Sequence, residues 1–182
     1  SGSFQAVSPA EKITEYADGT DNYKSSTYNG GLDAAVVIPK YDRVFDGRPS
    51  LAVQDKVTMK PGDRIFSVGY GPRSEEYDPN PLSNNSTMRE PQTIPGTVLA
   101  QKGNKIIFIT GIEGYGPRPD NNVRHGDSGG TSIDAQGNYL GDMVAGSSKP
   151  LTGYKLELAY NVDLPAGTED KMYNFGVTQV ID

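Results

Sequence analysis

The chain has 182 residues and a formal net charge of −6, with 22 glycines, 13 prolines and no cysteine. This length suits one domain or two small ones with a real core, and the missing cysteines exclude disulfides and thiolate metal sites. No Lys/Arg cluster is present to neutralise phosphates, which argues against a nucleic-acid partner. No apolar run approaches the roughly 18 residues of a membrane-spanning helix, so we expect no membrane span.

Short apolar runs separated by turn residues predict an all-β sandwich or barrel, and no segment has a convincing amphipathic helix pattern. Turn residues at 60–63, 102–104 and 134–138 separate several of the runs. The polar stretch 72–91, rich in Pro and Asn, predicts a long exposed loop, and the least apolar connection, 54–63, is the candidate domain boundary. The predicted strands cover residues 34–38, 51–53, 64–70, 96–100, 105–110, 130–133, 139–146, 154–160 and 173–180.

The strongest chemical signal is the segment 126–130, which reads Gly-Asp-Ser-Gly-Gly. It places Ser128 in a turn where little side-chain bulk shields its hydroxyl or the neighbouring backbone N–H groups. A nucleophile in acyl transfer needs such an exposed Oγ, with amide donors close enough to hold the oxyanion that forms on attack. The alternative is that Ser128 merely occupies a glycine-rich turn.

The order of five motifs along the chain resembles that of the chymotrypsin family of serine proteases. The segment 126–130 matches the nucleophile segment of that family residue for residue. Residues 31–37 are similar to the family's aspartate-bearing strand, and residues 68–71 to the start of its second barrel. Residues 141–146 are similar to its substrate-lining strand, and residues 175–180 to its closing segment.

This resemblance implies an all-β, chymotrypsin-like double Greek-key β-barrel with its active site between the two barrels. The first barrel would be incomplete, with residues 1–56 as its C-terminal part and 57–182 as the second barrel with the nucleophile loop. The implied activity is that of a serine endopeptidase, which hydrolyses peptide or protein substrates through an acyl-enzyme and needs no metal or organic cofactor. We expect a secreted or extracytoplasmic protein.

Carried over residue by residue, the resemblance makes Ser128 the nucleophile and Asp33 the carboxylate that orients a histidine. The backbone N–H groups of Gly126 and Ser128 would form the oxyanion hole, and Asp127 would brace the loop from beneath. Asp33 could otherwise be an ordinary turn residue that caps a loop before an apolar strand.

The same resemblance implies a substrate site on both sides of the nucleophile. A neutral amide six residues before Ser128 offers no charge partner to a Lys or Arg side chain, so strict trypsin-like selectivity is not expected. The strand that follows would pair with an extended substrate backbone, and we expect a medium-sized, uncharged or polar residue at the cleavage site. The implied substrate-binding residues are Asn122, His125, Val144, Ala145, Gly146 and Ser147.

The chain departs from the family in its histidine. The family's base precedes the aspartate, but residues 1–32 contain no histidine and the single one in the chain is His125. From the rim of the oxyanion loop, His125 could hardly reach the Ser128 proton and contact Asp33 at the same time. A solvated rim position or a substrate-pocket role suits it better.

Three interpretations therefore stay open. In the first, this is the Ser128-bearing chain of a protease whose histidine lies upstream of Ser1, either on an associated fragment of the same precursor or outside the given sequence. In the second, the chain is a catalytically inactive chymotrypsin-like scaffold that acts as a protein-binding module. In the third, it is an unrelated β-rich binding module. The presence of both Asp33 and Ser128 favours the first.

Overall fold

The computed structural model describes residues 15–16, 34–35, 46–71, 91–110, 122–124, 126–146 and 150–181. The chain divides into two compact units, Ser1–Ser50 and Leu51–Asp182. In the first unit, β1 (Glu15–Tyr16) pairs antiparallel with β2 (Ala34–Ala35). The division between residues 56 and 57 that the sequence indicates stays a prediction.

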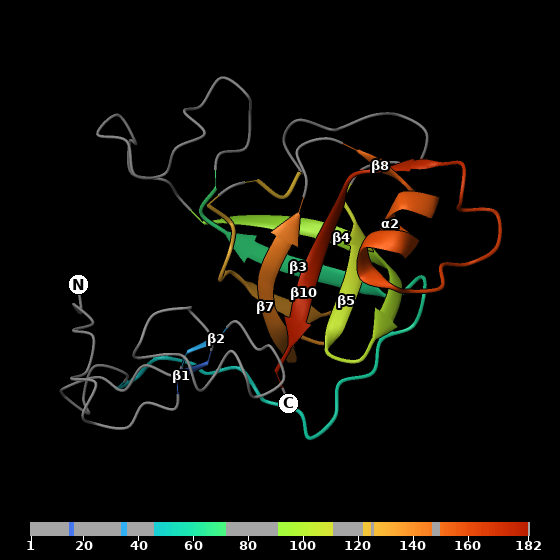
Figure 1. Ribbon diagram of the computed structural model, residues 1–182. Helices are drawn as coiled ribbons and strands as arrows, with labels where there is room; N and C mark the ends of the chain where they lie inside the picture. Colours follow the sequence, from blue (N-terminus) through green and yellow to red (C-terminus); the bar gives the residue numbers. More distant parts are fainter. Residues whose placement is uncertain are drawn as a thin grey trace, which may run out of the picture. The chain divides into compact units, whose positions relative to one another are not determined.

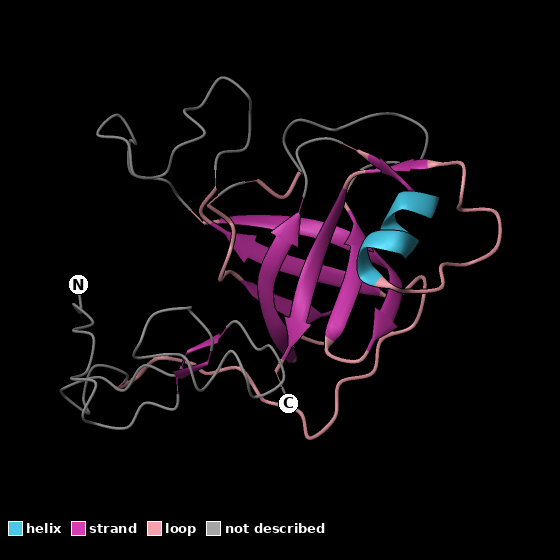
Figure 2. Cartoon of the chain, in the orientation of Figure 1, coloured by secondary structure: helices cyan, strands magenta, loops and turns pink. Residues whose placement is uncertain are grey.

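The second unit contains a closed barrel of six antiparallel strands (Figures 1 and 2), which confirms the predicted β-barrel. Around the barrel the order is β10-β5-β4-β3-β6-β7, so β3, β4 and β5 are successive neighbours and β6 returns to the other edge of β3. The barrel strands are β3 (Arg64–Gly69), β4 (Gln92–Lys102), β5 (Lys105–Ile109), β6 (Thr131–Asp134), β7 (Tyr139–Gly146) and β10 (Phe175–Val180).

Two of the predicted turns connect neighbouring barrel strands. Lys102 pairs with Lys105 across the β4–β5 hairpin, where Gly103 has a φ of 58°. Between β6 and β7, Oδ1 of Asp134 accepts the backbone N–H groups of Gln136 and Asn138, each at 2.9 Å. An aspartate that bonds the backbone two residues ahead replaces a backbone turn, so both connections follow from local sequence.

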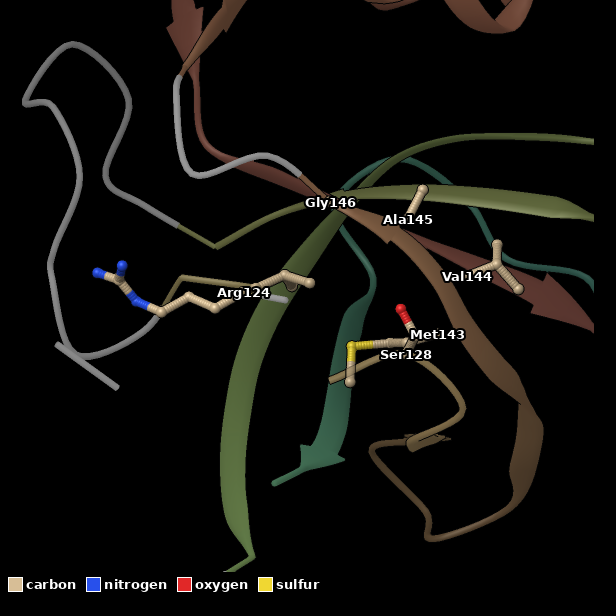
Figure 3. Close-up of a pocket in the computed structure, with 7 residues that line it drawn as sticks. Arg124, Ser128, Met143, Val144, Ala145 and Gly146 are labelled. Atoms are coloured by element: carbon tan, nitrogen blue, oxygen red, sulfur yellow. The ribbon is translucent and has the colours of Figure 1, made fainter. Parts of the chain in front are cut away.

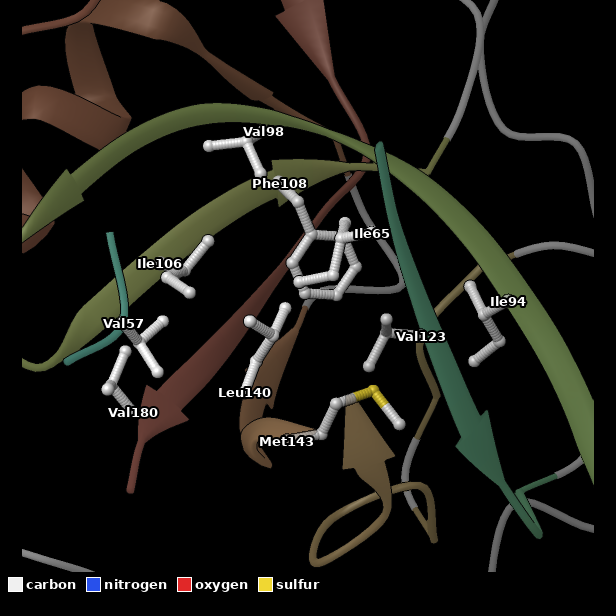
Figure 4. Packing of buried hydrophobic residues seen from close by; sticks show 10 residues of the cluster. All are labelled: Val57, Ile65, Ile94, Val98, Ile106, Phe108, Val123, Leu140, Met143 and Val180. Carbon is white, nitrogen blue, oxygen red and sulfur yellow. The ribbon is translucent and has the colours of Figure 1, made fainter. Parts of the chain in front are cut away.

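The hydrophobic core has two parts on opposite faces of the strands. Ile106 and Phe108 belong to the cluster inside the barrel (Figure 4), whereas Ile107 between them belongs to the second cluster, as strand alternation requires. The second cluster also contains Leu156 and Phe175. Burial of each such side chain stabilises the fold by about 1.5–3 kcal/mol, so the barrel is a rigid support for the loops at its ends.

The strand predicted over residues 154–160 is wrong, because these residues form the helix α2 (Gly153–Tyr160). Apolar side chains alternate with others along the segment Tyr-Lys-Leu-Glu-Leu-Ala-Tyr, and a period of two indicates a strand. Several of these residue types, however, also favour a helix. Only Leu156 and Gly153 of the helix are buried, and Leu158 is exposed.

Capping at both ends selects the helix. Oγ1 of Thr152 accepts the backbone N–H of Lys155 at 3.2 Å, and Asn161 ends the helix in the left-handed conformation with a φ of 51°. The short strands β8 (Leu151–Thr152) and β9 (Met172–Tyr173) pair beside it. The predicted strand over 173–180 is thus divided between β9 and β10.

Two further predicted strands are found only in small part among the described residues. The strand predicted over 51–53 amounts to a single bridge between Val53 and Tyr139. Of the strand predicted over 34–38, Ala34 and Ala35 form β2, and residues 36–38 lie outside the described residues. In the described ranges, no helix combines the length and the apolar character that crossing a membrane requires.

Removal of the Thr152 cap should destabilise the second unit. We expect Thr152→Ala to lower the free energy of unfolding by about 1 kcal/mol, because the N–H of Lys155 loses its acceptor. Guanidinium unfolding measures the change, and Thr152→Ser is the matched control because it keeps the hydroxyl. Equal stability of the Ala and Ser variants would contradict the capping role.

Candidate active site

The loop that carries Ser128 is bonded both to itself and to β7. Within the loop, the N–H of Asp127 donates to the carbonyl of Arg124 and the N–H of Gly130 donates to the carbonyl of Asp127, each at 3.0 Å. Toward β7, the N–H of Gly129 donates to the carbonyl of Met143, and the N–H of Met143 donates to the carbonyl of Gly130, both at 2.8 Å. The backbone of the loop is therefore fixed on each side of Ser128.

Asp127 connects the same loop to the end of β3. Its side chain is fully buried, and its Oδ1 and Oδ2 accept the backbone N–H groups of Gly71 and Arg124, both at 2.8 Å. A Cβ at Gly69 would lie 2.2 Å from Oδ1, so only glycine leaves room for the carboxylate there. Hydrogen bonds to an ionised group are about twice as strong as neutral ones, and these two hold the loop against β3.

Ser128 itself is exposed, between two glycines with positive φ. Gly126 has a φ of 103° and Gly129 a φ of 82°. Residues with a Cβ rarely adopt this part of conformational space. A Cβ at Gly129 would meet nothing within 4 Å, so the backbone conformation and not the available space requires glycine at that position.

The N–H groups of the loop divide into two sets. Those of Asp127, Gly129 and Gly130 donate to backbone carbonyls, as given above. Within the described part of the chain, the N–H groups of Gly126 and Ser128 have no hydrogen-bond acceptor. These two N–H groups belong to the residues that the sequence resemblance assigns to an oxyanion hole, and Ser128 beside them is exposed.

Ser128 lies between two pockets and lines both of them. The first has a volume of about 320 Å³ and lies between the loop and β7 (Figure 3). The second has a volume of about 330 Å³ and lies between the loop and the end of β3. The first is lined by Val123, Arg124, Ser128, Met143, Val144, Ala145 and Gly146, and the second by Val68, Gly69, Tyr70, Gly126, Asp127, Ser128, Gly129, Gly130 and Thr131.

The first pocket brings together the predicted substrate strand and the predicted nucleophile. Val144, Ala145 and Gly146 line it together with Ser128. Asn122, predicted as a substrate contact, is buried at 1% exposure and does not line it, whereas the next residue, Val123, does. The site-residue assignments themselves stay predictions.

Val123, Arg124 and Tyr70 are among the pocket-lining residues that the sequence did not assign to the site. Val123 packs so closely that a Cβ at Gly146 would lie 2.4 Å from its Cγ1. Arg124 follows it in the first pocket, and Figure 3 shows that its guanidinium extends away from Ser128. Tyr70 lines the second pocket. Tyr70 could have been predicted as a site residue, because it lies between Gly69 and Gly71 in a segment that resembles the protease family. The packing of Val123 depends on tertiary contacts that no local pattern reveals.

Asp33, His125 and Ser147 lie outside the described residues. The described site thus consists of the nucleophile loop, its two N–H donors and the two pockets. Across the same residues, no group of three His, Cys, Asp or Glu side chains comes close enough to hold a metal ion.

Comparison of the sequence with protein-family models found no match, and comparison with curated proteins found none either.

Replacement of the buried carboxylate should loosen the loop. We expect Asp127→Asn to lower the free energy of unfolding by about 1.5–3 kcal/mol, because an amide can accept only one of the two N–H groups and opposes the other with its own NH₂. Urea unfolding measures the loss, with Asp163→Asn at an exposed position as the matched control. Similar stability of the two variants would contradict the bracing role of Asp127.

Proposed function

We propose that the chain is the nucleophile-bearing part of a chymotrypsin-like serine endopeptidase. The observation that carries the proposal is the pair of N–H groups on Gly126 and Ser128, which have no acceptor among the described residues and flank an exposed serine hydroxyl. Preorganised donors at the point where negative charge develops are commonly the largest single contribution to acyl-transfer catalysis.

The barrel topology supports the same proposal. Three successive strands, β3, β4 and β5, are joined by a fourth, β6, which lies beside the first of them. This is the Greek-key order. We propose a double Greek-key barrel of which residues 57–182 form the second barrel and residues 1–56 part of the first, in a secreted or extracytoplasmic protein.

The proposed reaction follows the serine-histidine-aspartate mechanism. A histidine held by Asp33 takes the proton of Ser128 as Oγ attacks the scissile carbonyl carbon. The N–H groups of Gly126 and Ser128 hold the resulting oxyanion. The imidazolium then protonates the leaving amine as the C–N bond breaks, and water hydrolyses the acyl-enzyme with the same imidazole as base. The substrate is a peptide or protein.

The base histidine decides between this proposal and a second candidate. We propose that the base lies on a segment upstream of Ser1, since His125, three residues before Ser128 in the sequence, could hardly serve both Ser128 and Asp33. The presence of only one histidine, at 125, favours the alternative of a catalytically inactive scaffold that binds other proteins. The two candidates differ in whether Ser128 is activated.

A fluorophosphonate probe tests activation of Ser128 directly. We expect one adduct, mapped by mass spectrometry to Ser128, in the longest natural form of the protein. Ser128→Ala should abolish the adduct, and His125→Ala should leave it unchanged. Absence of the adduct from every form would favour the inactive scaffold. Loss of the adduct in His125→Ala would instead identify His125 as the base and overturn the upstream assignment.

Asp33 should matter for turnover more than for folding. We expect Asp33→Asn to lower kcat for a peptide substrate by about 10⁴-fold, because the imidazole then loses the carboxylate that fixes its tautomer. Steady-state kinetics measure the effect, with Asp46→Asn at an exposed position as the matched control. A decrease of less than about tenfold would exclude Asp33 from the triad.

A further inference from the structure

We infer that Tyr70 and the glycine backbone beside it form a binding site for a large apolar side chain, preferably aromatic, immediately after the scissile bond. The inference rests on the proposed function and adds to it the class of residue that the leaving-group side of the substrate carries. It comes from the second pocket at Ser128, of which the proposed mechanism uses Gly126 and Ser128 but not Tyr70.

The placement of Ser128 assigns the two pockets to the two sides of the cleaved bond. Ser128 lines both pockets, and their other lining residues differ. A peptide whose carbonyl carbon lies at Oγ continues in both directions from that point. The acyl side is expected to run along the β7 segment that lines the first pocket. The leaving-group side then enters the second pocket.

Tyr70 gives the second pocket its only large aromatic surface among the described lining residues. It follows Gly69, the last residue of β3, and is 56% exposed. Tyrosine rings with one face exposed and an apolar body are common anchors in recognition sites, because they bury a large area at little cost in side-chain entropy. The pocket volume of about 330 Å³ is at the lower end of the range for ligand sites.

Two glycines that line the second pocket, Gly69 and Gly130, have no room for a side chain. A Cβ at Gly69 would lie 2.2 Å from Oδ1 of Asp127, and a Cβ at Gly130 would lie 2.2 Å from the carbonyl oxygen of Val68. Neither position can carry a side chain without displacing its neighbour. A pocket that contains Tyr70 and has no side chain at these two glycines suits a planar side chain, which can stack against the tyrosine ring or meet it edge to face.

The described lining of the second pocket presents no charged group that would favour a charged side chain of the substrate. Asp127 is the only Asp, Glu, His, Lys or Arg side chain among its described lining residues. Its carboxylate is fully buried and accepts the N–H groups of Gly71 and Arg124. The surface that meets a ligand therefore consists of the Tyr70 ring, peptide groups and small side chains, so neither a cationic nor an acidic side chain gains an ion pair there.

Aminolysis of the acyl-enzyme tests the pocket separately from the acyl side. An amino acid amide competes with water for the ester on Ser128: its nitrogen attacks the carbonyl, an amide bond forms, the ester C–O bond breaks, and the proton that the amine loses returns to Oγ. We expect phenylalanine amide to capture the acyl group more efficiently than glycine amide in the longest natural form of the protein. Tyr70→Ala should reduce this preference about fivefold, the size of one aromatic contact.

Two further variants make the test specific. Tyr70→Phe should keep the preference, because the ring remains. Tyr154→Ala is the matched control, since Tyr154 is 58% exposed on α2 and lines neither pocket. If an acyl-enzyme forms and Tyr70→Ala behaves like Tyr154→Ala, the inference is overturned while the proposed function stands. If no acyl-enzyme forms in any variant, the proposed function fails and this inference fails with it.

Discussion

A buried carboxylate fixes the loop around which the candidate site is built. Asp127 is completely buried, and its two oxygens accept backbone N–H groups from the end of β3 and from within the loop itself. Burying a carboxylate raises the free energy of the fold unless hydrogen-bond donors replace the lost water. If the loop moved away from β3, the Asp127 side chain would lose one of these donors. Because Ser128 is the next residue, its position and its exposure follow from the position of Asp127.

The same arrangement explains why two particular N–H groups are available. The loop bonds to itself and to β7 through the N–H groups of Asp127, Gly129 and Gly130, which leaves those of Gly126 and Ser128 without an acceptor in the described chain. Glycines with positive φ at 126 and 129 allow the backbone to turn in this way. The loop lies between the end of β3 and β7, so a pocket forms on each side of Ser128.

Local sequence predicted the features that depend on local chemistry. The hairpin at Gly103, the turn at Asp134 and the exposed Ser128 follow from residues next to one another in the chain. The sequence predicts a strand where helix α2 forms, because apolar residues alternate along residues 154–160. The capping residues Thr152 and Asn161 lie outside this alternating segment. The pocket position of Val123 could not be predicted, since its side chain packs against Gly146 and Gly176, which are distant in the sequence and which the barrel brings beside it.

The most direct test of the central claim is the crystal structure of the longest natural form of the protein after reaction with a peptidyl phosphonate. We expect a covalent bond from Oγ of Ser128 to phosphorus in this structure. One phosphoryl oxygen should lie about 2.7–3.1 Å from the backbone nitrogens of both Gly126 and Ser128. An unmodified Ser128, or a phosphoryl oxygen directed away from both N–H groups, would contradict it.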